Sequence, residues 1–202
     1  IEYQGFSVYP ETLLQRLKGS QACVWAMGVS QNRVSHEDYV KVTQDYPLAA
    51  AKALSGLSDL FKFVYVSSGG ANPSPTSLTP FYGHIQGRTE TTLLLLPSSG
   101  HPSLKPFSVR LRYVDPANDP SAWETITLRP DWHALETSIT YGLMGPVLRL
   151  LAPAFVFPTR VVGSFITGLA MGNGESLPGD QEGVNGGGRI IWNRAMREMS
   201  GL

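Results

Sequence analysis

Two serines and a tyrosine are the residues of this sequence whose types and spacing best suit chemistry on a carbonyl group. Ser67 and Ser68 close the β-branched and aromatic run Lys62–Ser68, and Tyr82 follows Ser68 after fourteen positions. Where the run forms a buried strand and Tyr82 begins a helix, these side chains face the sheet edge at which ligands bind. A serine hydroxyl can stabilise a developing oxyanion, and a tyrosine beside a cation can act as a general acid. In the competing interpretation, the serines cap a turn and Tyr82 packs on the start of the helix.

A second candidate site follows another apolar run. Gln21–Met27 closes on Gly28 and is typical of a strand that is buried on both faces. A glycine at a strand end lets a ligand approach the backbone closely, although it also forms ordinary tight turns. Ala26, Met27 and Gly28 are therefore candidate ligand contacts.

The other reactive side chains have spacings that fit no site. The histidines are scattered without a cysteine cluster, three aspartates lie among prolines as turn residues do, and four glycines lack the strand and long helix that flank a phosphate-binding loop. These residues are His36, His84, His101 and His133, then Asp115, Asp119 and Asp131, then Gly183, Gly186, Gly187 and Gly188. We therefore expect no metal site.

The composition indicates one globular domain, 1–202, without a dominant charge. The 202 residues include 16 Lys+Arg and 16 Asp+Glu, and 42% are hydrophobic. This balance offers no electrostatic footprint for a phosphate backbone, which argues against a nucleic-acid partner. Because no apolar run has the length of a membrane span and the first residues do not resemble a signal peptide, we expect a cytoplasmic protein that contacts no membrane. The lone Cys23 lies in an apolar run, where a thiol packs as a small buried hydrophobe.

The spacing of apolar residues predicts alternating helices and strands. The expected elements are helices over 11–18, 39–60 and 81–96, with Pro47 kinking the second or delaying its start, and strands over 21–27 and 62–68. This order is typical of a parallel sheet with helices on both faces. We therefore predict a doubly wound α/β fold.

The second half of the chain is predicted to contain one further central strand. Phe107–Val114 alternates apolar and polar residues, and Glu124–Leu128 competes for the same place. The remaining expected elements are a helical pattern over 131–151 broken at Gly142, Gly145 and Pro146, a helix over Thr159–Met171, a mobile glycine-rich loop over Gly172–Gly188, a strand at Ile190–Trp192, and a helix over Asn193–Met199 that Asn193 caps.

Several segments, in this order, resemble the atypical short-chain dehydrogenase/reductases. They are Ala26–Ser30, Asp45–Tyr46, Val64–Asn72, Tyr82–Glu90, Phe107–Val109 and Ile190–Ala195, which together span nearly the whole chain. The most similar branch contains the NAD(P)-binding relatives of the Tat-interacting protein and the NmrA-like regulators. The resemblance implies a Rossmann-like domain of three α/β/α layers that binds NAD(P)(H), with 131–188 lying on the substrate side as a lid.

The active site of that family combines a serine, a tyrosine, and a lysine four residues after the tyrosine. Ser68 and Tyr82 match the first two, whereas Gln86 stands at the lysine position. A neutral amide cannot stabilise a phenolate as an ammonium does, so hydride chemistry driven by the tyrosine should be impaired. Arg88 is a poor substitute because it lies on another face of the helix. The resemblance thus implies Ser68, Tyr82 and Gln86 as catalytic residues, and Ala26, Met27, Gly28, Thr43, Ser67, Tyr82 and Gln86 as cofactor contacts.

The N-terminal part of the sequence departs from the family. The opening strand, glycine-rich turn and helix that hold the pyrophosphate have no counterpart, and residues 1–9 resemble the third strand of the family instead. Without the first two strands, the family's sheet would have a gap in its middle. We therefore expect either that the 202 residues are a fragment, or that the third strand pairs elsewhere or a partner fills the gap.

Three functions fit these residues. The first is an NAD(P)(H)-dependent oxidoreductase for a small organic carbonyl or alcohol, with Tyr82 as acid and base and Ser68 orienting the oxygen. The second is an isomerase or cyclase that needs a positioned polar acid but no hydride. The third is a cofactor-binding regulator or scaffold, which would tolerate Gln86 and could present the apolar segment 140–157 to a partner.

Overall fold

A mostly parallel sheet forms the centre of the molecule. The computed structural model describes residues 1–128 and 139–202 and arranges five strands in the order β1-β2-β3-β7-β6. The strands are β1 (Ala22–Trp25), β2 (Phe61–Ser68), β3 (Leu104–Leu111), β6 (Val184–Asn185) and β7 (Ile190–Trp192). Only the short edge strand β6 pairs antiparallel, so the carboxyl ends of the other four meet at one edge of the sheet.

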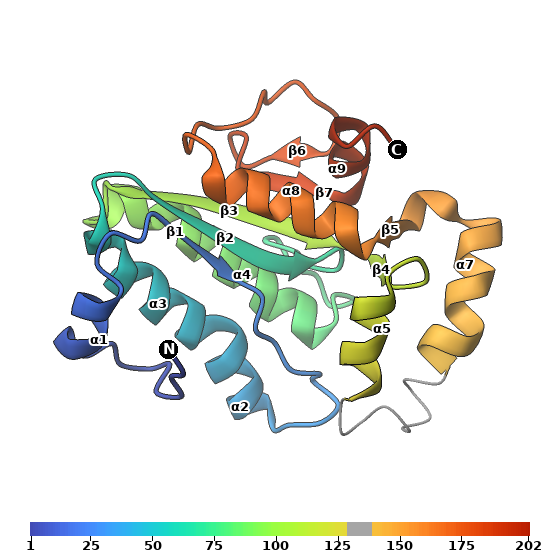
Figure 1. Cartoon of the computed structure of the whole chain (residues 1–202), viewed down its shortest axis with the longest axis horizontal. Coiled ribbons are helices and arrows are strands. Elements are labelled where there is room, and N and C mark those ends of the chain that lie inside the picture. The colour runs from blue at the N-terminus through green and yellow to red at the C-terminus, as the bar shows by residue number, and fades with distance from the viewer. Residues whose placement is uncertain (129–138) are drawn as a thin grey trace.

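Helices cover both faces of this sheet and give three layers (Figure 1). One layer holds α1 (Glu11–Arg16), α2 (His36–Val40), α3 (Tyr46–Leu54) and α4 (Phe81–Leu95), and the other holds α8 (Thr159–Met171) and α9 (Asn193–Met199). Beyond the carboxyl ends of the strands lie α5 (Pro120–Thr127), α7 (Gly145–Leu151) and the small sheet of β4 (Tyr113–Asp115) and β5 (Val156–Pro158). The predicted doubly wound α/β architecture is confirmed.

Strand β2 supplies the centre of the core because strands cover both of its edges and helices cover both of its faces. Phe63 and Val64 are each 0% exposed, and they belong to different apolar clusters. Phe63 packs in the cluster that includes Ala50 and Leu93 of the α3 and α4 layer. Val64 packs in the cluster of the α8 and α9 layer. Successive side chains of a strand point to opposite faces, so this continuous apolar run is the pattern of a central strand.

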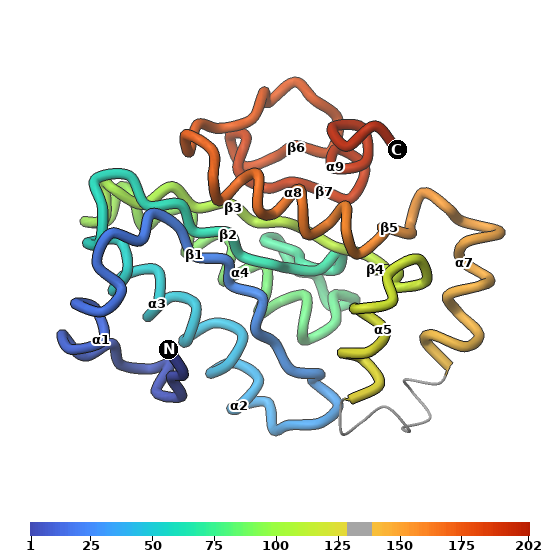
Figure 2. Tube along the Cα trace, in the orientation of Figure 1, coloured from blue at the N-terminus to red at the C-terminus, as the bar shows by residue number. Residues whose placement is uncertain are grey.

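Strand β1 lies at the edge of the sheet, which corrects two predictions. It pairs only with β2, and Val24 is 43% exposed, so the strand is not buried on both faces. The described sheet is continuous from β1 to β7 and has no gap in its middle. Figure 2 traces β1 along the open side of the sheet.

Residues 1–9 form no strand, contrary to the sequence prediction. They contain an irregular loop whose aromatic side chains pack on the core. The ring of Phe6 lies 5.9 Å from that of Trp25 and 5.7 Å from that of Tyr46, centroid to centroid. Burial of aromatic surface, rather than strand pairing, therefore holds this segment.

The long helix predicted over 39–60 consists of several pieces. Helices α2 and α3 are joined by a π-helical turn at Lys41–Asp45, and Pro47 lies in the first turn of α3. Proline has no N–H for the helical ladder, so it is tolerated where a new helix begins. Of the two predictions for Pro47, the late start is wrong, because helical residues begin at His36, and Pro47 instead comes just after the π-helical turn.

The competition for the further central strand is settled in favour of Phe107–Val114. β3 contains the first part of this range, while Glu124–Leu128 overlaps helix α5, which Asp119 caps through the Ala122 N–H at 3.3 Å. Of the broken helical pattern over 131–151, residues 131–138 lie outside the described residues. The part that is described forms a π-helical turn at Ile139–Met144 followed by α7.

Two details near the C-terminus differ from the sequence prediction. The glycine-rich stretch contains strand β6 and the turn into β7, where Gly186, Gly187 and Gly188 all adopt positive φ. Trp192, not Asn193, occupies the cap position of α9, and the Asn193 amide donates to the Ala154 carbonyl at 2.9 Å. No described helix combines the length and the apolarity that crossing a bilayer requires.

Candidate active site

Ser68 and Gln86 meet at the carboxyl edge of the sheet. Ser68 is the last residue of β2, Gln86 lies in the second turn of α4, and the serine hydroxyl donates to Gln86 Oε1 at 2.5 Å. Both side chains are half-buried. A short contact of this kind fixes the side chains relative to each other and gives the serine a neutral rather than a charged partner.

Tyr82 lies one turn before Gln86 on the same helix and contacts the turn that follows Ser68. A Cβ added to Gly70 would overlap the Tyr82 hydroxyl, so this glycine is required for the close approach of the phenol. The N–H of Tyr82 donates to Gln31 Oε1 at 3.0 Å, because helix α4 begins without a capping side chain of its own. Gln31 was not predicted, and nothing in its local sequence pattern marks it.

Two further glycines let the loop after β2 pack directly on α4. A Cβ at Gly83 would overlap the Gly70 carbonyl, and one at Gly87 would overlap the Asn72 carbonyl. The Asn72 N–H donates to the Gly83 carbonyl at 2.9 Å. This close packing holds the turn after Ser68 against the helix that carries Tyr82 and Gln86.

Thr43 links β2 and α4, the two elements that carry Ser68 and Gln86. It lies buried in the π-helical turn, where its carbonyl accepts from the Tyr65 hydroxyl at 3.1 Å and from Thr89 Oγ1 at 3.3 Å. Burial and the nearby Glu90 carboxylate raise the pKa of Tyr65, so its phenol stays protonated and remains a donor. A cofactor contact through Thr43 remains a prediction, because the observed contacts link the helix layer to β2.

A buried ion pair behind the site escaped the sequence analysis. Glu90 and Arg110 are 0% and 4% exposed in their side chains, and Arg110 Nη2 lies 2.5 Å from Glu90 Oε2. Ser108 Oγ donates to the same carboxylate at 2.8 Å, and the guanidinium lies 4.6 Å from the centroid of the Trp192 ring. This pair ties α4 to β3 and β7. The only sign of it in the sequence is that Glu90 and Arg110 are charged residues within largely apolar segments.

Arg88 does not replace the missing lysine. Its side chain is exposed and donates to Gln44 Oε1. The position supports the expectation from helical geometry that Arg88 and Gln86 face different directions.

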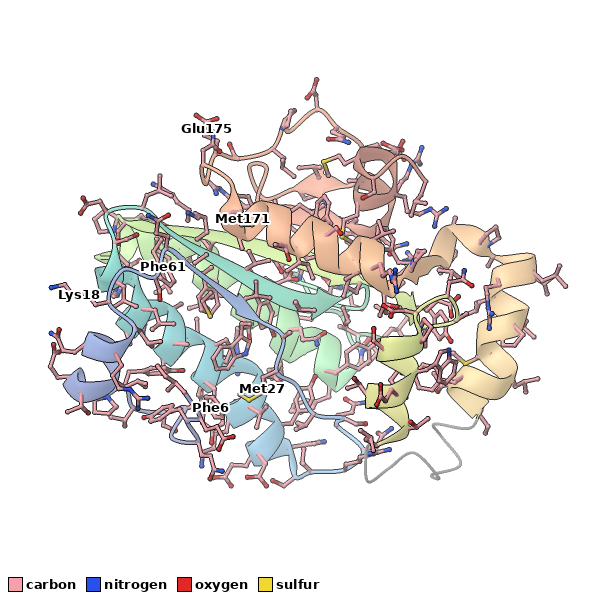
Figure 3. All side chains as sticks on the ribbon, viewed as in Figure 1. Phe6, Lys18, Met27, Phe61, Met171 and Glu175 are labelled. Atoms are coloured by element: carbon pink, nitrogen blue, oxygen red, sulfur yellow. The ribbon has the colours of Figure 1, made fainter. Side chains whose placement is uncertain are left out.

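The residues after β1 are only partly suited to ligand binding. Ala26 and Gly28 are exposed, and a Cβ at Gly28 would meet no atom within 4 Å, so there is open space beside it. Met27 packs against the apolar cluster beneath the sheet, and Figure 3 shows it beside Phe6. A contact from Met27 to a ligand would therefore involve its backbone.

A nicotinamide and its ribose fit the residues at this edge better than a pyrophosphate does. The polar groups available are Tyr82, the Gln86 amide, and Ser67, whose buried hydroxyl has no partner among the described residues. No described strand is followed by a G-x-G-x-x-G turn into a helix, which is the usual pyrophosphate cradle. The described residues thus offer polar groups that suit the reactive half of the cofactor.

The histidines and acidic residues do not gather into a metal site within the part of the chain that the structure describes. Asp115 lies 3.4 Å from Arg149 Nε, and Asp119 caps α5, so both have structural partners. Asp131 and His133 lie outside the described residues.

Solved structures with a similar fold are short-chain dehydrogenases and their relatives. A halohydrin dehalogenase, HheC, bound to ethyl (2S)-oxiran-2-ylacetate matches with a TM-score of 0.54 at 15% identity, over 92% of this chain and 73% of that one. L-Sorbose reductase from Gluconobacter frateurii with NADPH and L-sorbose matches with a TM-score of 0.53 at 12% identity, over 90% and 69%. A short-chain dehydrogenase/reductase from Burkholderia thailandensis matches with a TM-score of 0.55 at 11% identity, over 90% and 66%. The chain therefore has the Rossmann-like fold of these proteins.

Sequence comparison identifies a nearer relative. Botcinic acid biosynthesis cluster B protein 16 of Botryotinia fuckeliana is 35% identical over 160 residues, which are 77% of this chain and 98% of that protein. The chain belongs to the same family as this protein.

A second member of the comparison matches over a shorter region. Leucinostatins biosynthesis cluster protein T of Purpureocillium lilacinum is 38% identical over 69 residues, 34% of this chain and 26% of that protein. The chain thus spans nearly all of the first relative and about a quarter of the second. A scan against protein-family models finds no match.

Proposed function

We propose that this protein is an NAD(P)(H)-dependent oxidoreductase of a small organic carbonyl or alcohol. The observation that carries the proposal is the Ser68–Gln86 hydrogen bond at the carboxyl edge of a doubly wound sheet, with Tyr82 one turn away on α4 and close to Gly70. Ligands of such sheets bind at this edge. NADPH in solved structures of the same fold supports a nicotinamide cofactor.

The residues of the chain would divide the work on a carbonyl substrate. When bound near Tyr82 and Gln86, a dihydronicotinamide would provide hydride-transfer chemistry. Tyr82 gives its phenolic proton to the carbonyl oxygen, and Ser68 turns its hydroxyl from Gln86 to that oxygen, exchanging one hydrogen bond for another. The Gln86 amide can hold a ribose hydroxyl. Because an amide carries no proton that it could pass on, Tyr82 would regain its proton from water.

The genomic setting of the relatives supports a biosynthetic substrate. Both matching proteins are named for biosynthesis clusters, one for botcinic acid and one for leucinostatins. We therefore propose that the substrate is a small intermediate of a secondary metabolite. The segment 131–188 is the proposed substrate side, since its described helix α7 projects beyond the carboxyl ends of the strands.

The experiment is a spectroscopic assay of NADPH and NADH oxidation with a panel of aldehydes and ketones. Tyr82→Phe should lower turnover by about 10² to 10⁴-fold, the usual contribution of a positioned acid. The control is Tyr46→Phe, which removes a phenol from α3. Full activity of Tyr82→Phe, or equal losses in both variants, would contradict the assigned role.

Gln86 favours a second function, an isomerase or cyclase that uses the same pocket without redox chemistry. Such an enzyme needs a positioned hydroxyl but no charged lysine, and the neutral Ser68–Gln86 pair supplies it. Incubation of candidate substrates with and without nicotinamide separates the two functions. Product formation without net cofactor oxidation identifies the non-redox enzyme, and consumption of one cofactor per product identifies the oxidoreductase.

A further inference from the structure

A cavity of about 530 Å³ lies where β3 and β7 end, beside the start of α9. Its walls include Arg112, which directly follows β3, then Phe155 before β5, and Trp192, Asn193 and Arg197 around the start of α9. Both β3 and β7 end here, so the cavity opens at the same sheet edge as Ser68.

Arg112 connects this cavity to the turn after Ser68. The Gly69 N–H donates to the Leu111 carbonyl at 2.7 Å, and a Cβ on Gly69 would lie 2.9 Å from Arg112 Cγ and 3.5 Å from Arg112 Nε. Adjacent Cα atoms are about 3.8 Å apart. The Arg112 side chain therefore lies against Gly69, the residue that directly follows Ser68.

The cavity has positive charge that its own carboxylates do not neutralise. Arg112 stacks 4.1 Å from the centroid of the Phe155 ring, and Arg197 donates to the Val156 carbonyl at 2.7 Å. Neither has an acidic partner among the described residues. Arg194, by contrast, already pairs with Glu182 and Glu198.

The remaining walls combine exposed aromatic surface with one buried acceptor. Phe155 is 44% exposed, although aromatic surface is usually buried, and the Arg112 guanidinium lies against its ring. Asn193 is 3% exposed, and its Oδ1 atom accepts no hydrogen bond among the described residues. A buried acceptor without a donor is costly, so the folded chain leaves one polar atom unsatisfied beside the cavity.

We infer that this cavity binds the carboxylate of an amphiphilic organic acid, with Arg112 and Arg197 holding the charge and Phe155 contacting the apolar body. As an assignment of substrate class, this inference rests on the proposed function. A carboxylate accepts planar, two-pronged hydrogen bonds from guanidinium groups, which makes arginine the suitable partner. Such an acid would extend from the cavity toward Ser68.

Calorimetric titration of the full chain with 3-phenylpropanoate tests the inference, with its methyl ester as the uncharged match. We expect saturable binding of the acid, none of the ester, and at least tenfold weaker binding to Arg112→Gln. Arg16→Gln on α1 makes the same charge change at the far end of the molecule and should bind normally. Thermal unfolding of each variant confirms that it is folded.

Four outcomes would overturn the inference, and the first three concern the acid itself. They are equal binding of acid and ester, normal binding by a folded Arg112→Gln, and displacement of the acid by NADPH, which would make this a nucleotide site. Phenyl phosphate binding tenfold more tightly than the acid would also overturn it, in favour of a phosphate site. Tyr82→Phe separates the two proposals, because it should keep acid binding while losing turnover. Acid binding without any turnover by the wild type would contradict the redox function alone.

Discussion

At the scale of single residues, one neutral side chain decides how the site can work. Gln86 accepts the Ser68 hydroxyl at 2.5 Å, whereas an ammonium at this position would have only hydrogens to offer. Glutamine in place of lysine gives the Ser68 hydroxyl an acceptor, which fixes its orientation. The same replacement removes the positive charge that would stabilise a phenolate at Tyr82. Restoring a cation with Gln86→Lys should therefore raise the turnover of an oxidoreductase, and it should leave a non-redox enzyme slower or unchanged.

The buried pair of Glu90 and Arg110 yields a prediction about stability. Glu90→Gln removes a charge that is 0% exposed and leaves the guanidinium uncompensated, so we expect a loss of about 3 to 5 kcal/mol in the free energy of unfolding. Urea denaturation measures this loss. Glu182→Gln, which breaks an exposed pair with Arg194, is the control and should leave the midpoint unchanged.

A double variant tests whether the unpaired charge causes this loss of stability. Glu90→Leu combined with Arg110→Met removes both charges together and should cost less than Glu90→Gln alone. A larger loss in the double variant would show that packing, not charge, dominates at this site.

At the scale of elements, helix α4 is the part that assembles the site. It carries Tyr82, Gln86 and Glu90 on successive turns, so its position relative to the loop after β2 sets the geometry. Gly87 permits that position, because a Cβ there would overlap the Asn72 carbonyl. The close packing of the helix and the loop consequently requires that Gly87, like Gly83, carries no side chain.

Gly87→Ala should destabilise the protein by about 1 to 3 kcal/mol, the usual cost of overpacking. The matched control is Gly163→Ala in α8, where a new Cβ meets no atom within 4 Å. Because alanine favours helix more than glycine does, this control should gain about 0.5 to 1 kcal/mol. Equal effects of the two substitutions in chemical denaturation would contradict the packing at Asn72.

The elements that sequence patterns predicted well are those with a strong local period. The buried run of β2 and the apolar face of α8 were predicted nearly to the residue. The edge position of β1 was missed, because the local sequence around Val24 does not show whether a second strand pairs with β1. Ser68 was selected from the residue pattern and Gln86 through a family resemblance, but their direct bond depends on tertiary placement, as do the Gln31 cap and the Glu90–Arg110 pair.

At the scale of the whole molecule, the position of β1 at the edge of the sheet bears on how a cofactor could bind. The described sheet is continuous and ends at β1, and the solved structures of the same fold are longer than this chain, which covers 60% to 73% of them. The nicotinamide end of a cofactor has suitable polar groups at the carboxyl edge, whereas a glycine-rich pyrophosphate cradle is not found among the described residues. Cofactor affinity is therefore the property on which the proposed function most depends.

The most direct measurement is calorimetric titration of the 202-residue chain with NADPH and NADH, after its mass is confirmed. We expect saturable binding at one site per chain, weakened at least tenfold in Tyr82→Phe/Gln86→Ala and unchanged in Tyr46→Phe. Absence of binding by a cooperatively folded sample would contradict the oxidoreductase proposal for this chain.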